Sequence, residues 1–144
     1  MVVDPAGSAA APSVPDPINP TLLRAWRAAS ARFPETPLPG LCAPFERWRD
    51  DPEGFVRHHF GERPWEAQRA AWEELYSARR LAWRGPRKCG KSRWLEWTVC
   101  HFICTRPSVV LSVSASWNQV RNVLWAGIAD LHACAAARGT PLPG

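Results

Sequence analysis

The sequence predicts an α/β fold in which two short strands and the helices around them occupy the second half of the chain. Three observations support this prediction. A glycine-containing loop follows the apolar segment at residues 80–83, and an apolar helical pattern follows that loop. The segment SVVLSVSA at residues 108–115 then precedes another helical pattern. Strands and helices that alternate in this order are typical of a βαβ unit with a parallel sheet.

The first part of the chain lacks such a pattern. Residues 1–19 are rich in Ala, Pro and Ser without periodicity, which predicts a disordered tail. Residues 20–63 are expected to form short helices and loops, including a helix that begins at Pro52 after an Asp51 cap. Residues 64–144 are expected to form the incomplete α/β core.

The elements of this core follow from local signals. Pro64 is expected to open a helix, and RLAW at residues 80–83 is a short strand candidate. SRWLEWTVCHFIC, after the loop, predicts a helix that is buried on at least one side. Residues 108–115 are the strongest strand candidate, and Ser116 is expected to cap a long helix that Gly139 ends.

The loop itself carries the chemistry. Gly85-x-x-x-x-Gly90-Lys91-Ser92 has the spacing of a phosphate-binding loop. Glycines allow the backbone N–H groups to turn towards phosphate oxygens, and the helix that follows adds the positive end of its dipole. Lys91 is expected to reach the β- and γ-phosphates of ATP, and the Ser92 hydroxyl to bind Mg²⁺. The expected phosphate-binding residues are Gly85, Arg87, Lys88, Cys89, Gly90, Lys91 and Ser92.

Charge and cysteine content agree with this interpretation. The formal net charge is +5, and Glu96 and Asp130 are the only acids after Glu74. A basic second half favours phosphate-bearing partners, although arginine-rich codon usage in a GC-rich genome explains the bias equally well. The five cysteines include no C-x-x-C pair, and the spacing of Cys100 and Cys104 places both on one helix face, where we expect buried free thiols and no metal site. We expect a reducing, cytoplasmic setting, with neither a signal peptide nor a membrane span.

Three segments together resemble a known family. PWEAQ at residues 64–68, LAWRGPRKCGKS at 81–92 and VVLSVSASWNQVRNVLW at 109–125 are similar to the N-terminal ATPase region of phage terminase large subunits. Those proteins package DNA into viral capsids. The resemblance implies a P-loop NTPase core of the RecA/helicase-like type, with Gln68 and the nearby Trp65 on the adenine side. It also implies double-stranded DNA, a portal and a small terminase subunit as partners of the intact protein, in the cytoplasm of a bacterial host.

The sequence also departs from that family. A motor of this kind needs a Walker B carboxylate pair after an apolar strand, whereas Asp130 is predicted to lie within a helix. The acidic cluster of the terminase nuclease has no counterpart either. We therefore expect an ATP-binding fragment or prophage remnant, inactive or weakly active alone, of a parent DNA-packaging ATPase. Alternatives are another P-loop NTPase, such as a helicase-type remodeller or a small-molecule kinase, or a non-catalytic adaptor.

Overall fold

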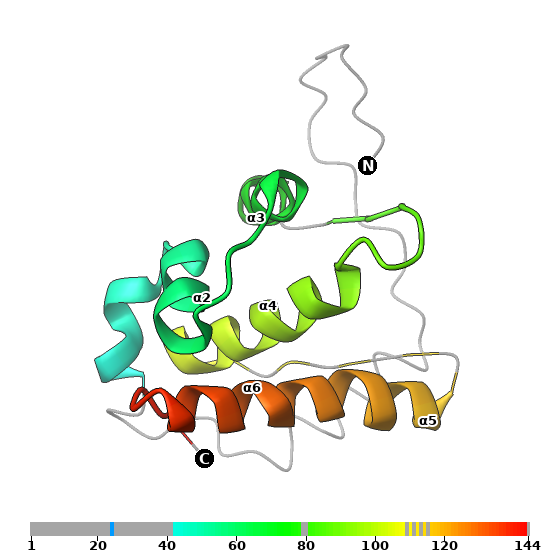
Figure 1. Cartoon of the computed structure of the whole chain (residues 1–144). Coiled ribbons are helices and arrows are strands. Elements are labelled where there is room, and N and C mark those ends of the chain that lie inside the picture. The colour runs from blue at the N-terminus through cyan, green and yellow to red at the C-terminus, as the bar shows by residue number, and fades with distance from the viewer. Residues whose placement is uncertain are drawn as a thin grey trace.

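The computed structural model describes residue 24 and residues 42–78, 81–108, 110, 112, 114 and 116–143. Within these residues all regular secondary structure is helical. Figure 1 shows α4 in the middle of the fold, between α3 and the long C-terminal helix. The elements are η1 (Ala43–Trp48), α2 (Pro52–Phe60), α3 (Glu66–Ala78), α4 (Lys91–Thr105), α5 (Trp117–Gln119), η2 (Val120–Trp125) and α6 (Ala126–Ala137).

The predicted α/β fold is wrong, because neither strand candidate forms a strand in the part of the chain that the structure describes. Residues 81–86 have no regular structure, and Leu81 and Trp83 pack individually against the helical core. Residues 108, 110, 112 and 114 are likewise in no strand. In Figure 1 the described residues 81–86 lie above α4 in the view, and the described residues among 108–114 lie below it.

The predicted helix boundaries are confirmed at three places. The Asp51 carboxylate accepts a hydrogen bond from the backbone N–H of Gly54 at 2.7 Å, and α2 begins at Pro52. The Ser116 hydroxyl accepts from the backbone N–H of Gln119 at 3.3 Å. Gly139 follows the C-terminal helix with φ +72°, a left-handed conformation that glycine adopts without steric cost.

The C-terminal helix is one continuous rod made of α5, η2 and α6. Its middle section, η2, is a π-helix, which the sequence did not predict. The wider turn of a π-helix rotates the residues after it relative to those before it, and such turns are frequent at functional sites. Val120 and Leu124 on this section are buried against α4 and its surroundings.

The core is built around α4. Its indole-bearing residues Trp94 and Trp97 are buried, and both rings pack against Trp72 of α3, with centroids 6.0 and 6.1 Å away. Two of the indole nitrogens in this core are paired: Trp72 Nε1 donates to Thr98 Oγ1 at 2.8 Å, and Trp94 Nε1 donates to the carbonyl of Gln68 at 2.9 Å, whereas Trp97 Nε1 is buried without a hydrogen-bond partner among the described residues. These hydrogen bonds fix α3 against α4 in one register.

The two cysteines of α4 also belong to this core. Cys100 and Cys104 are buried free thiols, as predicted from their spacing. Burial disfavours the thiolate and raises the pKa of each to about 12. Both are therefore neutral apolar side chains at physiological pH.

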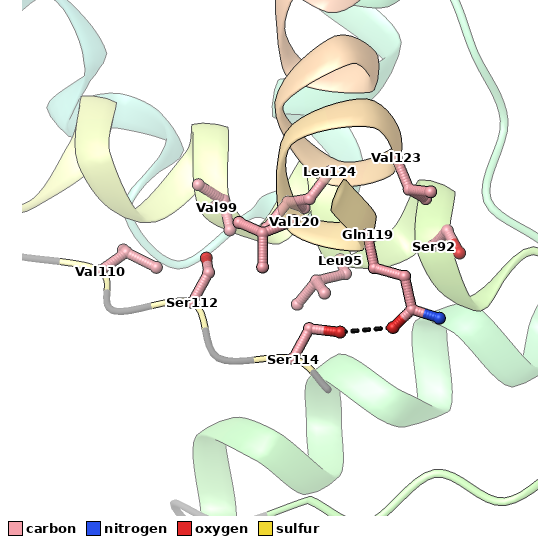
Figure 2. A pocket seen from close by; sticks show the side chains of 10 residues that line it. All are labelled: Ser92, Leu95, Val99, Val110, Ser112, Ser114, Gln119, Val120, Val123 and Leu124. Atoms are coloured by element: carbon pink, nitrogen blue, oxygen red, sulfur yellow. Dashed lines mark hydrogen bonds between the residues drawn. The ribbon is translucent and has the colours of Figure 1, made fainter. Parts of the chain in front are cut away.

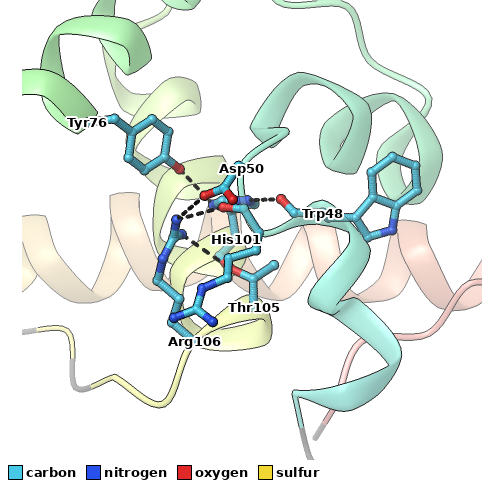
Figure 3. A network of polar contacts seen from close by, with 7 residues as sticks. Trp48, Asp50, Tyr76, His101, Thr105 and Arg106 are labelled. Carbon is cyan, nitrogen blue, oxygen red and sulfur yellow. Dashed lines mark hydrogen bonds and ion pairs between the residues drawn. The ribbon is translucent and has the colours of Figure 1, made fainter.

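A polar network joins η1, α3 and the end of α4 (Figure 3). His101 is fully buried, and its Nε2 lies 2.7 Å from the carbonyl of Trp48 while its Nδ1 lies 3.0 Å from the Tyr76 hydroxyl. Arg106 closes the network through Asp50 at 3.3 Å and stacks its guanidinium over the Tyr76 ring. Burial lowers the pKa of His101 to about 4, against the opposing effect of the Trp48 hydrogen bond. The neutral ring therefore donates from Nε2 to Trp48 and accepts the Tyr76 proton at Nδ1.

Candidate phosphate-binding site

The predicted phosphate-binding segment forms a loop that opens α4. Residues 87–88 make a turn, and the helix begins at Lys91, as the motif predicts. Two residues of the loop are in the left-handed region, Lys88 with φ +63° and Gly90 with φ +79°. A non-glycine residue in this region costs roughly 1 kcal/mol and is concentrated at functional sites. The helix therefore begins where the motif predicts, although the described residues 81–86 before the loop form no strand.

The loop wraps around the ammonium group of Lys91. Lys91 Nζ donates to the carbonyl of Gly85 at 2.9 Å and to that of Pro86 at 2.6 Å. It also lies 3.1 Å from Cys89 Sγ. These three contacts aim the side chain back into the loop and hold its charge at the N-terminal end of α4.

A cavity of about 450 Å³ lies at this helix end, lined by residues 87–93. Four of these seven residues are cationic, and none is acidic: Arg87, Lys88, Lys91 and Arg93. The N-cap Gly90 provides no side-chain cap, and the first turn of α4 holds no acid. The first backbone N–H groups of this helix are thus without a side-chain acceptor of the usual kind. An anion would complete both the charge balance and the hydrogen bonding.

Arg93 differs from the other cations because it forms a salt-bridge cluster. Its guanidinium pairs with Glu62 and, at 3.0 Å, with Glu96. Hydrogen bonding to Glu62 holds the pKa of Arg93 above its ordinary value, while burial raises the pKa of Glu96. The cluster joins α4 to the segment before α3. Arg93 therefore holds the helix in place, and Arg87, Lys88 and Lys91 carry the positive charge that faces the cavity.

The structure brings both residues of the predicted adenine side next to the loop. Gln68 is buried, and its carboxamide accepts from the Trp65 backbone N–H at 3.1 Å and donates to the Gly90 carbonyl at 3.1 Å. The carboxamide thus fixes the last residue of the loop. Trp65 is half exposed beside it. That either residue contacts adenine stays a prediction.

Ser92 lines a second, larger groove as well as the loop cavity. This groove has a volume of about 530 Å³ and lies between α4, η2 and the segment after α4 (Figure 2). The sequence did not predict this groove, because its walls come from separate segments that only folding brings together. Its lining residues are Ser92, Leu95, Val99, Val110, Ser112, Ser114, Gln119, Val120, Val123 and Leu124.

In comparisons with protein-family models, curated proteins and solved structures, no match to this chain was found. Together with the helical fold of the described residues, this overturns the resemblance to phage terminase large subunits, whose ATPase core is an α/β P-loop fold. The partners inferred from that resemblance, double-stranded DNA, a portal and a small subunit, stay predictions. Across the part of the chain that the structure describes, no helix combines the length and apolar character needed to cross a membrane.

Proposed function

We propose that this chain binds the phosphate groups of a nucleotide, such as ATP with Mg²⁺, at the loop Gly85–Ser92. One observation carries the proposal. The Lys91 ammonium is held by two loop carbonyls at the N-terminal end of a 15-residue helix, beside a cavity that three further cations line. The proposal depends on this local geometry and not on the α/β fold that the sequence predicted.

Electrostatics support an anion at this position. The N-terminal end of a helix carries roughly half a positive charge, so cations there destabilise the helix and anions stabilise it. Lys91 and Arg93 both occupy the first turn of α4, and only Arg93 has carboxylate partners among the described residues. A bound phosphate would convert the unfavourable position of Lys91 into a charge-assisted hydrogen bond.

Lys91, Ser92, the first turn of α4 and Gln68 of α3 have separate parts in such binding. Lys91 exchanges its carbonyl contacts for phosphate oxygens, and the N–H groups of the first turn of α4 donate to the same group. Gln68 keeps the Gly90 carbonyl turned away from the phosphate. The exposed Ser92 hydroxyl would share a Mg²⁺ ion with phosphate oxygens and water. We propose binding without hydrolysis, since no carboxylate lines this cavity among the described residues to orient an attacking water.

The test is a calorimetric titration of ATP with Mg²⁺ into the full chain and into Lys91→Ala. Loss of one charge-assisted contact corresponds to about 1.5–3 kcal/mol, so the affinity should fall about tenfold or more. Arg57→Ala is the matched control, because Arg57 is an exposed cation on α2 outside the loop. Circular dichroism should show equal helix content for all three proteins. Equal affinity of Lys91→Ala and the unmodified chain would refute the proposal.

A further inference from the structure

The groove beside the loop has the character of a ligand site. Leu95 and Val99 of α4 form one wall, and Val120, Val123 and Leu124 of the C-terminal helix form the other (Figure 2). Its volume of about 530 Å³ lies within the roughly 300–1,000 Å³ that small-molecule sites occupy. Leu95 and Val123 are 45% and 50% exposed, so the mouth of the groove presents apolar surface to solvent.

The groove is continuous with the phosphate-binding loop. Ser92, in the first turn of α4, lines both the cationic cavity and the groove. Leu95 and Val99 follow Ser92 at helical spacing and extend the same face of α4 away from the loop. A molecule with phosphates at Lys91 therefore has an apolar channel directly beyond its phosphates.

One edge of the groove is polar and prearranged. The Ser114 hydroxyl donates to Gln119 Oε1 at 2.6 Å, which turns the carboxamide nitrogen away from Ser114 (Figure 2). The Ser116 hydroxyl holds the Gln119 backbone at the start of the C-terminal helix. The Gln119 side chain thus offers N–H donors at a fixed position, next to the Ser112 and Ser114 hydroxyls.

We propose that this groove holds the nucleoside part of the nucleotide whose phosphates bind the loop. The base lies between Leu95 and Val123, and the Gln119 carboxamide donates to an acceptor atom of the base. This assignment rests on the proposed function and adds where the rest of the ligand lies. The competing position is the exposed Trp65 ring beside Gly90, which offers one stacking surface where the groove offers two apolar walls.

The experiment compares ATP with inorganic triphosphate, because both carry the phosphates and only ATP carries a nucleoside. Affinities are measured by calorimetry for the full chain and for the single variants Val123→Gln, Gln119→Ala, Trp65→Ala and Trp125→Gln. Val123 and Gln119 are exposed, so we expect their substitution to leave the core packing intact. Circular dichroism should show the same helix content for these variants as for the full chain. Trp125→Gln is the matched control, since Trp125 is an exposed apolar residue of the same helix that does not line the groove.

The full chain should bind ATP about tenfold more tightly than triphosphate. Val123→Gln and Gln119→Ala should each reduce that ratio by about fivefold or more while leaving triphosphate affinity unchanged, and Trp125→Gln should change neither. Equal affinities for ATP and triphosphate would overturn the groove assignment and leave phosphate binding intact. If only Trp65→Ala abolishes the preference for ATP over triphosphate, the groove assignment is also overturned, and the base lies on Trp65. Failure of the full chain to bind either ligand would overturn both proposals.

Discussion

Acid should destabilise this protein through His101. The side chain is fully buried and uncharged, with both ring nitrogens paired to neutral groups, Trp48 and Tyr76. Its pKa is lowered from 6.5 to about 4 in the folded state. The unfolded chain therefore binds more protons than the folded one between pH 6.5 and 4, so the free energy of unfolding rises with pH across that window.

The magnitude follows from the shift. Each pKa unit corresponds to about 1.4 kcal/mol, so about 3 kcal/mol of unfolding free energy is lost as the pH falls from 7 to 4. That is a large fraction of the roughly 5–15 kcal/mol that stabilises a typical domain. His59 acts in the same direction, because burial also lowers its pKa. Glu96 acts in the opposite direction, because burial raises its pKa.

A variant that does not titrate at position 101 separates the contribution of His101 to the pH dependence of stability from those of His59 and Glu96. Urea unfolding, followed by tryptophan fluorescence between pH 7 and pH 4, should be measured for the full chain and for His101→Gln. The Gln carboxamide can donate and accept but does not titrate. His101→Gln should be less stable at pH 7 and should lose less stability on acidification, by about 3 kcal/mol. Parallel stability curves for the two proteins, or an NMR titration of His101 with a pKa near 6.5, would refute the reasoning.

Gly90→Ala and Gly127→Ala test the packing around α4, and Gly139→Ala serves as a control. Gly90→Ala should destabilise the fold and lower triphosphate affinity in calorimetry, because Gly90 has φ +79° and a Cβ there would lie 2.7 Å from Gln68 Nε2. Gly139→Ala is its control: φ is +72° with nothing within 4 Å of the Cβ, so we expect only the backbone cost of about 1 kcal/mol and no change in affinity. Gly127→Ala should cost about 1–3 kcal/mol in urea unfolding, because its Cβ would lie 2.2 Å from the Glu96 carboxyl carbon. The double variant Gly127→Ala/Glu96→Ala should lose less unfolding free energy than the sum of the two single variants, because the smaller side chain makes room for the Cβ. A loss equal to that sum would show that the two residues do not interact.

The features predicted correctly from the sequence depend on residues close together in the chain. The Asp51 cap, the Ser116 cap and the end of the helix at Gly139 each involve groups three to five residues apart. The loop that opens α4 belongs to the same class, since the motif places its glycines and Lys91 within eight residues. Such signals act before tertiary packing and survive an error in the overall fold.

The strands were predicted wrongly because a strand is stable only beside a hydrogen-bonded neighbour. RLAW and SVVLSVSA have suitable composition, but apolar residues can equally pack against helices. Leu81 and Trp83 do so against the core, and Val110 lines the groove next to α4. The groove and the Gln68–Gly90 hydrogen bond also escaped prediction, because folding brings together residues from separate segments, which for the hydrogen bond are 22 positions apart in the sequence.

The loop is positioned by helix packing, where a sheet was expected to position it. Gln68 donates to the carbonyl of Gly90, and its own carbonyl accepts from the Trp94 indole, so one residue of α3 contacts both the end of the loop and the first turn of α4. On the other side of that turn, Arg93 is paired with Glu62, which precedes α3. These two connections fix the start of α4 relative to α3, and Lys91 and Ser92 line the cavity at this helix end. In this chain helix packing holds the start of α4 and the loop before it, and a strand before such a loop is only one way to position it.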